Sequence, residues 1–139
     1  MIETNRGVVH PNLCDIMGHL TTRHYAAIFD DASYHLAHAC GLPIDRETGF
    51  VDLELTTRFV AELRAGDLFF VRSGISRIGN SSFSAHHELV NCNGNNIAAS
   101  QEASYAFFDL IARKSRLLPE EFRTRAAALM TASGDQSNS

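Results

Sequence analysis

The sequence has few cysteines, and their placement suits neither cross-links nor a bound metal. It holds three in 139 residues, an odd number, at Cys14, Cys40 and Cys92, with no C-x-x-C motif. A disulfide framework and a structural zinc site are therefore both disfavoured. Buried or half-buried thiols in a reducing compartment are the usual alternative, so we predict a cytoplasmic location.

Positive charge and long apolar runs are also scarce. The 12 lysines and arginines stand against 16 acidic residues, a formal net charge of −4, which argues against a nucleic-acid partner. No apolar run approaches the roughly 18 residues that span a bilayer. The N-terminus, MIETNRGVV, lacks the basic start and apolar core of a signal peptide. We therefore expect no membrane association.

What is present fits one globular domain. Hydrophobic residues make up 45% of the chain and charged residues 20%, which is typical of a protein with an ordinary core. The last residues are small and polar and have too little apolar surface to fold. We predict a domain over residues 1–131 and a disordered polar tail over residues 132–139.

The spacing of apolar residues predicts one long helix and a set of strands. From Tyr25 to Ala39 apolar residues recur at helical spacing, with Thr21 or Thr22 as the N-cap and Gly41 as the stop. Over residues 51–63 the period changes to two, which predicts a long half-buried strand. The other expected elements are strands over 4–10, 68–78, 81–92 and 97–110 and a terminal helix over 118–130.

The turns between successive strands are short, which implies an antiparallel meander. The long helix must bury its apolar face against that sheet, and small residues such as Ala99 and Ala103 would let it approach closely. We predict an α+β fold with a curved antiparallel sheet of five or six strands wrapped around one long central helix. Its long sheet edges favour pairing across a dimer.

The segment LCDIMGHLTTRHYAAIFDD resembles the hotdog fold and, within it, the 4-hydroxybenzoyl-CoA thioesterase-like family of acyl-CoA thioesterases. The family pattern is roughly D-x-D-x-x-G-H-V-N-N-x-x-Y-x-x-x-F-E. Asp15 matches its second acid, Gly18 and His19 its Gly-His pair, and Tyr25 and Phe29 its aromatic positions. The later segments AELRAGDLFFVRSGISRIGNSSFSAHHEL and FFDLIARKSRLLPEEF are also similar to the family, so the resemblance spans nearly the whole chain.

Two departures from the pattern concern the acyl pocket. Leu13 replaces the first acid, and Thr21 and Thr22 replace the two asparagines. The match to the catalytic acid survives, whereas the polar groups that shape the acyl pocket in the family do not. The resemblance therefore does not identify the acyl group.

The resemblance implies hydrolysis of an acyl-CoA thioester, which requires a nucleophile or base and donors for the developing oxyanion. Asp15 would be the nucleophile or general base. Its apolar neighbours are expected to desolvate it in part, namely Leu13, Cys14, Ile16 and Met17. In the family, a main-chain N–H at the position of Thr22 polarises the thioester carbonyl, and His19 would be a supporting donor. The alternatives are a purely local turn contact for Asp15 and an N-cap for the Thr22 hydroxyl.

Coenzyme A enters this reaction as part of the substrate, and no further cofactor is expected. Its phosphates favour basic residues near the site, although Arg113, Lys114 and Arg116 can equally be solvated loop charges. The resemblance places the active site at the interface of a dimer or tetramer. The predicted substrate-binding residues are Gly18, Tyr25, Arg77, Ser81, Ser82, Arg113 and Lys114.

Two other readings of the residues remain open. Asp30 and Asp31 on the helix are rival catalytic acids, although structural ion pairing is the ordinary role of such residues. The helix also carries His35 and His38, but a metal site is disfavoured because His86 and His87 point to opposite faces of a strand. The alternative functions are a non-catalytic acyl-CoA-binding module and a hotdog hydratase or dehydratase.

Overall fold

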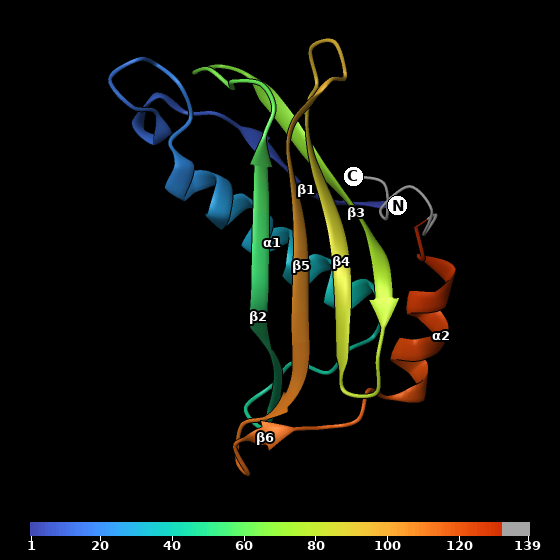
Figure 1. The fold of residues 1–139 in the computed structure, drawn as a ribbon. Coiled ribbons are helices and arrows are strands. Elements are labelled where there is room, and N and C mark those ends of the chain that lie inside the picture. The colour runs from blue at the N-terminus through green and yellow to red at the C-terminus, as the bar shows by residue number, and fades with distance from the viewer. Residues whose placement is uncertain (132–139) are drawn as a thin grey trace.

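One antiparallel sheet is folded around one long helix in the computed structural model, which describes residues 1–131 (Figure 1). The predicted disordered tail lies outside the described residues. The elements are, in chain order, β1 (Ile2–Val8), the 3-10 helix η1 (Pro11–Leu13), α1 (Thr22–Ala39), β2 (Thr48–Phe59), β3 (Leu68–Ile78), β4 (Ser82–Asn91), β5 (Ile97–Asp109), β6 (Lys114–Ser115) and α2 (Glu120–Ala128).

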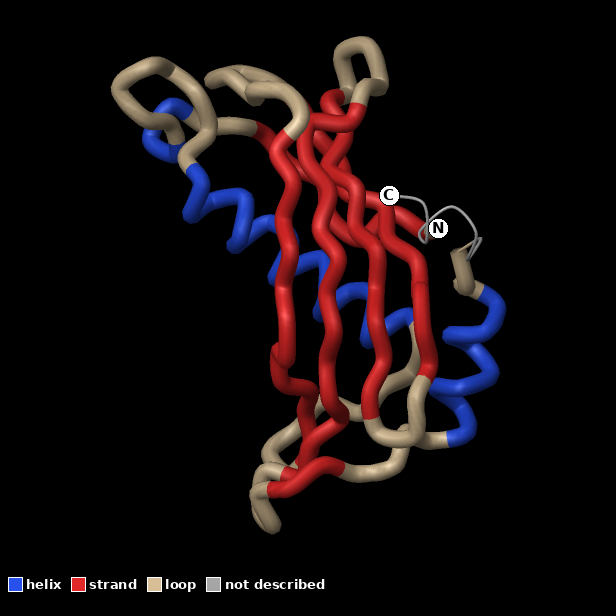
Figure 2. Tube along the Cα trace, in the orientation of Figure 1, coloured by secondary structure: helices blue, strands red, loops and turns tan. Residues whose placement is uncertain are grey.

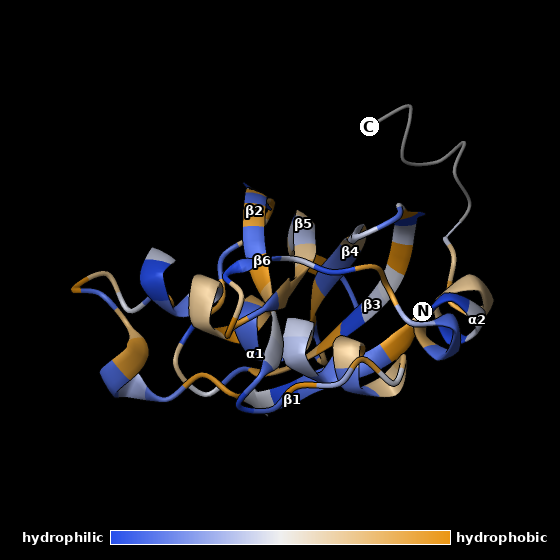
Figure 3. Cartoon of the chain, turned by 90° about the horizontal axis from the view of Figure 1, so that it is seen from below, coloured by the Kyte–Doolittle hydropathy of each residue, from blue (hydrophilic) through white to orange (hydrophobic). Residues whose placement is uncertain are grey.

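The sheet has the strand order β1-β3-β4-β5-β2, and the short β6 adds to the end of β5. Every neighbouring pair is antiparallel. Seen along the strands, α1 lies on one side of the row β2, β5, β4 and β3, and the sheet curves so that β1 lies on that side too (Figure 3). This is the predicted α+β architecture, with six strands around one long helix.

Helix α1 forms where the periodicity predicts it, because its apolar side chains follow one face. The helix ends at Ala39, and the chain turns away two residues later at Gly41, whose positive φ of 73° is a conformation that suits glycine. There the Leu42 N–H returns to the Ala37 carbonyl at 3.0 Å, which terminates the helix. The buried residues of the helix are Tyr25, Ile28, Phe29, Ala32, Ser33, Leu36 and Ala37.

The core divides into two clusters along this helix. Around its first half, Phe29 packs with Val71 and Leu89 of the sheet. Around its second half, Leu36 joins Phe83, whose ring lies 4.8 Å from that of Phe122 on α2. Helix α2 therefore closes the core at the C-terminal end of α1, and the N-terminal end of α1 is left near loops.

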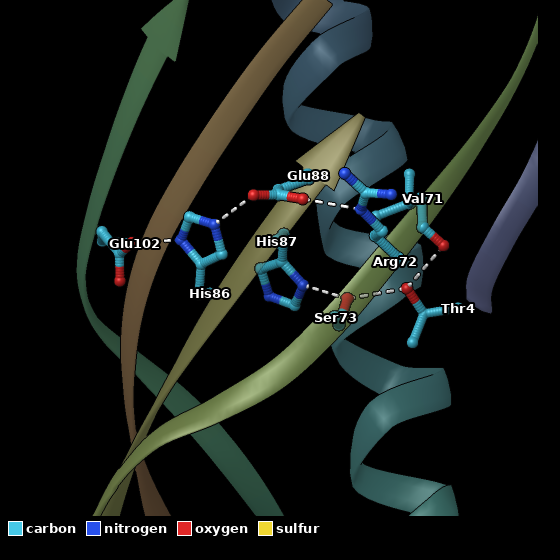
Figure 4. A network of polar contacts seen from close by, with 8 residues as sticks. All are labelled: Thr4, Val71, Arg72, Ser73, His86, His87, Glu88 and Glu102. Atoms are coloured by element: carbon cyan, nitrogen blue, oxygen red, sulfur yellow. Dashed lines mark hydrogen bonds and ion pairs between the residues drawn. The ribbon is translucent and has the colours of Figure 1, made fainter. Parts of the chain in front are cut away.

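A buried polar network crosses the sheet and reaches the helix. The fully buried His87 has its Nδ1 2.5 Å from the Ser73 hydroxyl and its Nε2 3.0 Å from the Tyr105 hydroxyl. Ser73 also contacts Thr4 at 2.7 Å, and the Tyr105 hydroxyl contacts Ser33 of α1. Figure 4 shows the part of the network between β1, β3 and β4. Burial lowers the pKa of His87 to about 3, so the ring is neutral.

The neighbouring His86 points to the outer face of the sheet, where it contacts charged carboxylates rather than neutral hydroxyls. Its ring lies between Glu102 and Glu88, with Nε2 2.9 Å from the Glu88 carboxylate (Figure 4). The hydrogen bond with Glu102 and then that with Glu88 raise its pKa to about 9, against the effect of burial. Arg72 completes this ion-paired row through a 2.6 Å contact with Glu88.

Strand β2 differs from its prediction in both length and burial. It ends at Phe59 rather than at residue 63, because the N–H groups of Val60 and Ala61 both donate to the carbonyl of Ala98 and the chain then leaves the ladder. The prediction of a half-buried strand is wrong for the single chain. Leu53 and Leu55 are exposed, since β2 is an edge strand with a bulge after Asp52.

The loops gather at the two ends of the strands (Figure 2). The segments before α1, between β2 and β3, and between β4 and β5 lie at one end, and β6 and the β3–β4 turn lie at the other (Figure 1). The 12 residues of β2 separate these ends by roughly 35 Å at the usual rise per residue. Among the described residues, no helix is long and apolar enough to cross a membrane.

Candidate active site

The loop before α1 is a tight turn fastened at its base. Cys14 and Leu20 form an antiparallel bridge, and within it the Asp15 N–H donates to the His19 carbonyl at 2.8 Å. The Gly18 N–H returns to the Asp15 carbonyl at 3.0 Å, and Gly18 has a φ of 80° that a side chain would strain. Asp15 therefore stands at a fixed position at the start of the turn.

One oxygen of the Asp15 carboxylate is engaged within the turn. Oδ1 accepts hydrogen bonds from the Met17 N–H at 2.8 Å and the His19 N–H at 3.2 Å. The local turn contact that the sequence allowed is therefore present. Of the four apolar neighbours expected to desolvate Asp15 in part, Ile16 and Met17 do not do so in the single chain, because they are 104% and 69% exposed at the tip of the turn. Leu13 and Cys14 are half-buried, as is Asp15 itself.

The first turn of α1 is open toward Asp15. Its N-cap residue is Thr21, but the Thr21 hydroxyl donates to the Leu13 carbonyl at 3.2 Å, and no side chain of the described residues caps the helix. The first N–H groups of the helix, at Thr22 and Arg23, therefore keep the positive end of its dipole uncovered. They border an open depression of about 610 Å³ lined by Cys14, Asp15, Ile16, Thr21, Thr22 and Arg23.

A second cavity shares Thr22 with this depression. Part of its wall is aromatic, because the Tyr25 ring packs edge-on against Phe59 at 5.0 Å. Burial raises the pKa of the Tyr25 hydroxyl. The second cavity has a volume of about 290 Å³ and is lined by His19, Leu20, Thr22, Tyr25, Phe59, Val60, Ala61 and Glu62.

Glu62 is a site residue that the sequence does not reveal. Its carboxylate lies 3.1 Å from Nε2 of His19. Alternation along residues 51–63 places Glu62 on the solvent face of a strand, whereas the real strand has ended three residues earlier. No sequence signal predicts the pair, because the contact depends on where β2 leaves the sheet.

The sequence profile of the Thioesterase-like superfamily matches residues 9–126, which is most of the chain. The chain belongs to this superfamily. No curated protein matches it. The match covers the turn before α1, α1 itself and strands β2 to β6, and it includes every predicted site residue. The predicted thioesterase family relationship is thereby confirmed.

Solved structures, two of them named as thioesterases, share the fold of this thioesterase-like protein. A protein from Staphylococcus aureus, solved in complex with CoA, has 22% identity and a TM-score of 0.81 over 95% of this chain and 89% of that one. The 1,4-dihydroxy-2-naphthoyl-CoA thioesterase from Synechocystis has 16% identity and a TM-score of 0.77 over 90% and 95%. The dynemicin thioesterase has 18% identity and a TM-score of 0.83 over 94% and 99%. The predicted hotdog fold is confirmed.

The predicted substrate-binding residues of this thioesterase-like protein divide between the two ends of the sheet. Gly18 and Tyr25 lie at the end that carries Asp15. At the far end, the Arg77 guanidinium donates to the Ser82 hydroxyl at 3.0 Å, and Arg113 stacks over an aromatic ring near β6. Ser81 and Lys114 belong to the same far end, in the β3–β4 turn and in β6. One chain alone does not bring the two sets together.

The rival acids lie farther along α1. The expected ion pairing is not found for Asp30 or Asp31 among residues 1–131. Desolvation raises the pKa of Asp30, and the charges of Asp52 and Asp31 raise it further. His35 and His38 are exposed on the same helix, and within the described part of the chain no three potential ligands converge on a metal position.

Proposed function

We propose that the protein hydrolyses an acyl-CoA thioester to a free acid and CoA. The observation that carries this proposal is the uncapped N-terminus of α1 beside Asp15, in one depression. The N–H groups at Thr22 and Arg23 offer hydrogen bonds and a positive dipole to a thioester carbonyl oxygen. Both interactions strengthen as that oxygen becomes negative, which is the requirement for stabilising the transition state.

Asp15 supplies the attack on the carbonyl carbon. Because the Met17 and His19 N–H groups hold Oδ1, the carboxylate keeps a fixed direction and Oδ2 is the oxygen that acts. It either attacks the carbonyl, releases CoA thiolate and forms an anhydride that water opens, or it takes a proton from an attacking water. Both routes end in one acid and one thiol for each water consumed, with no cofactor.

The apolar cavity beside Tyr25 and Phe59 is the place for the acyl group in this proposal. Its lining supports an apolar or aromatic group rather than a charged one. The CoA complex of the Staphylococcus aureus structure and the aryl-CoA substrate in the name of the Synechocystis enzyme support CoA as the leaving group.

Release of free CoA from a panel of aryl-, short- and long-chain acyl-CoA thioesters tests this function. We expect hydrolysis of at least one member, with free acid and CoA formed in equal amounts. Binding of acyl-CoA without hydrolysis of any member would instead support a binding module. Addition of water to an enoyl-CoA, with the thioester intact, would support a hydratase.

We also propose that two chains pair through β2. This 12-residue edge strand exposes Leu53, Leu55 and Phe59, which a second copy would cover. In antiparallel pairing about a twofold axis, the start of one β2 lies beside the end of the other. Arg113 and Lys114 of the second copy, near the start of its β2, then lie beside the Asp15 loop of the first and can reach the CoA phosphates.

A charge in the exposed edge should separate the two chains. Leu55→Lys places two lysines in the proposed interface, so we expect a monomer by sedimentation velocity and a lower rate of CoA release at equal protein concentration. Met130→Lys, at an exposed apolar residue after α2, is the control and should leave the mass unchanged. If Leu55→Lys sediments like the wild type, β2 is not the interface.

A further inference from the structure

We propose that Glu62 is a positioning residue for the hydrolysis, which fixes the His19 imidazole so that its Nδ1 accepts the proton of the attacking water. This inference rests on the proposed thioesterase function and assigns a task to a pair that the resemblance does not include. The pair is a contact of 3.1 Å between Nε2 of His19 and the carboxylate of Glu62.

The backbone, rather than chance side-chain placement, brings the pair together. The Leu20 N–H donates to the Leu63 carbonyl at 2.8 Å, and His19 forms an antiparallel bridge with Arg64. These contacts hold the Asp15 turn against the segment that follows β2. His19 and Glu62 therefore face each other from two segments that backbone hydrogen bonds hold together. Forming their contact costs less conformational entropy than it would between two mobile segments.

The pair contributes little to stability. The Glu62 side chain is 62% exposed and that of His19 is 22% exposed, and ion pairs open to water in this way add little to the free energy of unfolding. Their location indicates a role in the site instead, because both residues line the cavity beside Tyr25 and Phe59 at the helix N-terminus. Of the residues in that lining, Glu62 alone is acidic and His19 alone has an imidazole.

Hydrogen bonding to Glu62 determines which ring nitrogen carries the proton. A carboxylate accepts only, so it retains the proton on Nε2 and leaves Nδ1 as the basic atom of the neutral ring. A carbonyl held at Thr22 is near both Asp15 and His19, because Thr22 lines the depression together with Asp15 and the second cavity together with His19. His19 is then placed to act on water while Asp15 acts on the carbonyl.

The proton balance of this step is complete. Water oxygen bonds to the acyl carbon of the anhydride, and one water proton passes to Nδ1 of His19 while the bond from that carbon to the Asp15 oxygen breaks. Glu62 stabilises the imidazolium through Nε2–H. The imidazolium then returns the proton to the thiolate or to bulk water, so the pair ends the cycle as it began.

Two substitutions at Glu62, read by histidine ¹⁵N NMR and by steady-state kinetics, test the assignment. In the wild type the ¹⁵N shifts of the His19 ring should report a proton on Nε2. Glu62→Ala should remove this preference and lower kcat about tenfold, with KM changed less than twofold. Glu62→Gln, whose amide oxygen still accepts from Nε2–H, should keep the tautomer and recover part of kcat.

Glu120→Gln removes a carboxylate from the exposed first turn of α2 and is the matched control, with no expected change in tautomer or kcat. The assignment is overturned if Glu62→Ala keeps both the Nε2 tautomer and the wild-type kcat. An increase in KM alone would also overturn it. A wild type that releases no CoA would overturn the proposed function, whereas the NMR measurement would still decide whether Glu62 orients the ring.

Discussion

Asp15→Asn is expected to lower kcat for CoA release by at least about 100-fold, with a much smaller change in KM. Asparagine has nearly the shape of aspartate, and its Oδ1 still accepts from the Met17 and His19 N–H groups, so the turn should survive. What is lost is the negative charge on the second oxygen, which both proposed routes require. The measurement is steady-state kinetics on the best substrate of the acyl-CoA panel.

The rival acid on α1 provides the comparison for this result. Asp31→Asn removes an exposed carboxylate from the same helix and should keep nearly the wild-type kcat. Circular dichroism of both variants would verify that each retains the fold. Undiminished hydrolysis by Asp15→Asn would end the proposed mechanism, and a large loss in Asp31→Asn alone would transfer the role of the acid to the helix.

The second large effect is the acid sensitivity that His87 gives to the fold. Its pKa is about 3 in the folded chain and 6.5 in its ordinary state, so between these values the unfolded chain binds a proton that the folded chain does not. The stabilisation is therefore complete above about pH 6.5 and is lost as the pH falls toward 3. The slope of the unfolding free energy should approach about 1.4 kcal/mol per pH unit from this residue alone.

Urea unfolding of the wild type and of His87→Gln between pH 4.5 and 7, at one protein concentration, measures this contribution. The variant loses part of the network with Ser73 and Tyr105 and should be less stable at pH 7 by about 1–3 kcal/mol. Its unfolding free energy should nevertheless depend less on pH than that of the wild type. Parallel pH curves for the two proteins would contradict the assignment.

The adjacent His86 gives a control of opposite sign. Its pKa of about 9 lies above the ordinary 6.5, so its stabilisation is complete below about pH 6.5 and is lost as the pH rises through 9. His86→Gln should therefore flatten the alkaline part of the stability curve, whereas His87→Gln should leave that part unchanged. The two substitutions therefore measure separately the pH dependence that arises from the buried face of β4 and the pH dependence that arises from its outer face.

The sequence predicts most of the fold because its strongest patterns are local. The long helix was predicted from the apolar spacing that begins at Tyr25, and its structure runs over Thr22–Ala39. The opposite directions of His86 and His87 follow from alternation along a strand. Strand β6 was not predicted, because a strand of two residues has no periodicity.

The site was predicted less completely, for physical reasons. Asp15 and Thr22 lie on one short segment, so a motif can relate them, whereas Glu62 joins His19 through a tertiary contact. Alternation around Leu55 shows that two faces of β2 differ, but it does not show what covers the apolar one. In the single chain Leu53 and Leu55 stay exposed, and this is why the expected burial fails.

The two edge strands of the sheet, β1 and β2, differ in whether they would allow the protein to polymerise beyond a dimer. Pairing of β2 with β2 closes on itself, whereas pairing of β2 with β1 of the next chain would repeat without end and build a fibre. Edge β1 opposes this, because its ladder is interrupted between Glu3 and Asn5 and its surface carries the Arg6–Glu3 ion pair at 2.6 Å. The irregular first strand thus protects against polymerisation, and straightening it would be the change most apt to produce fibres.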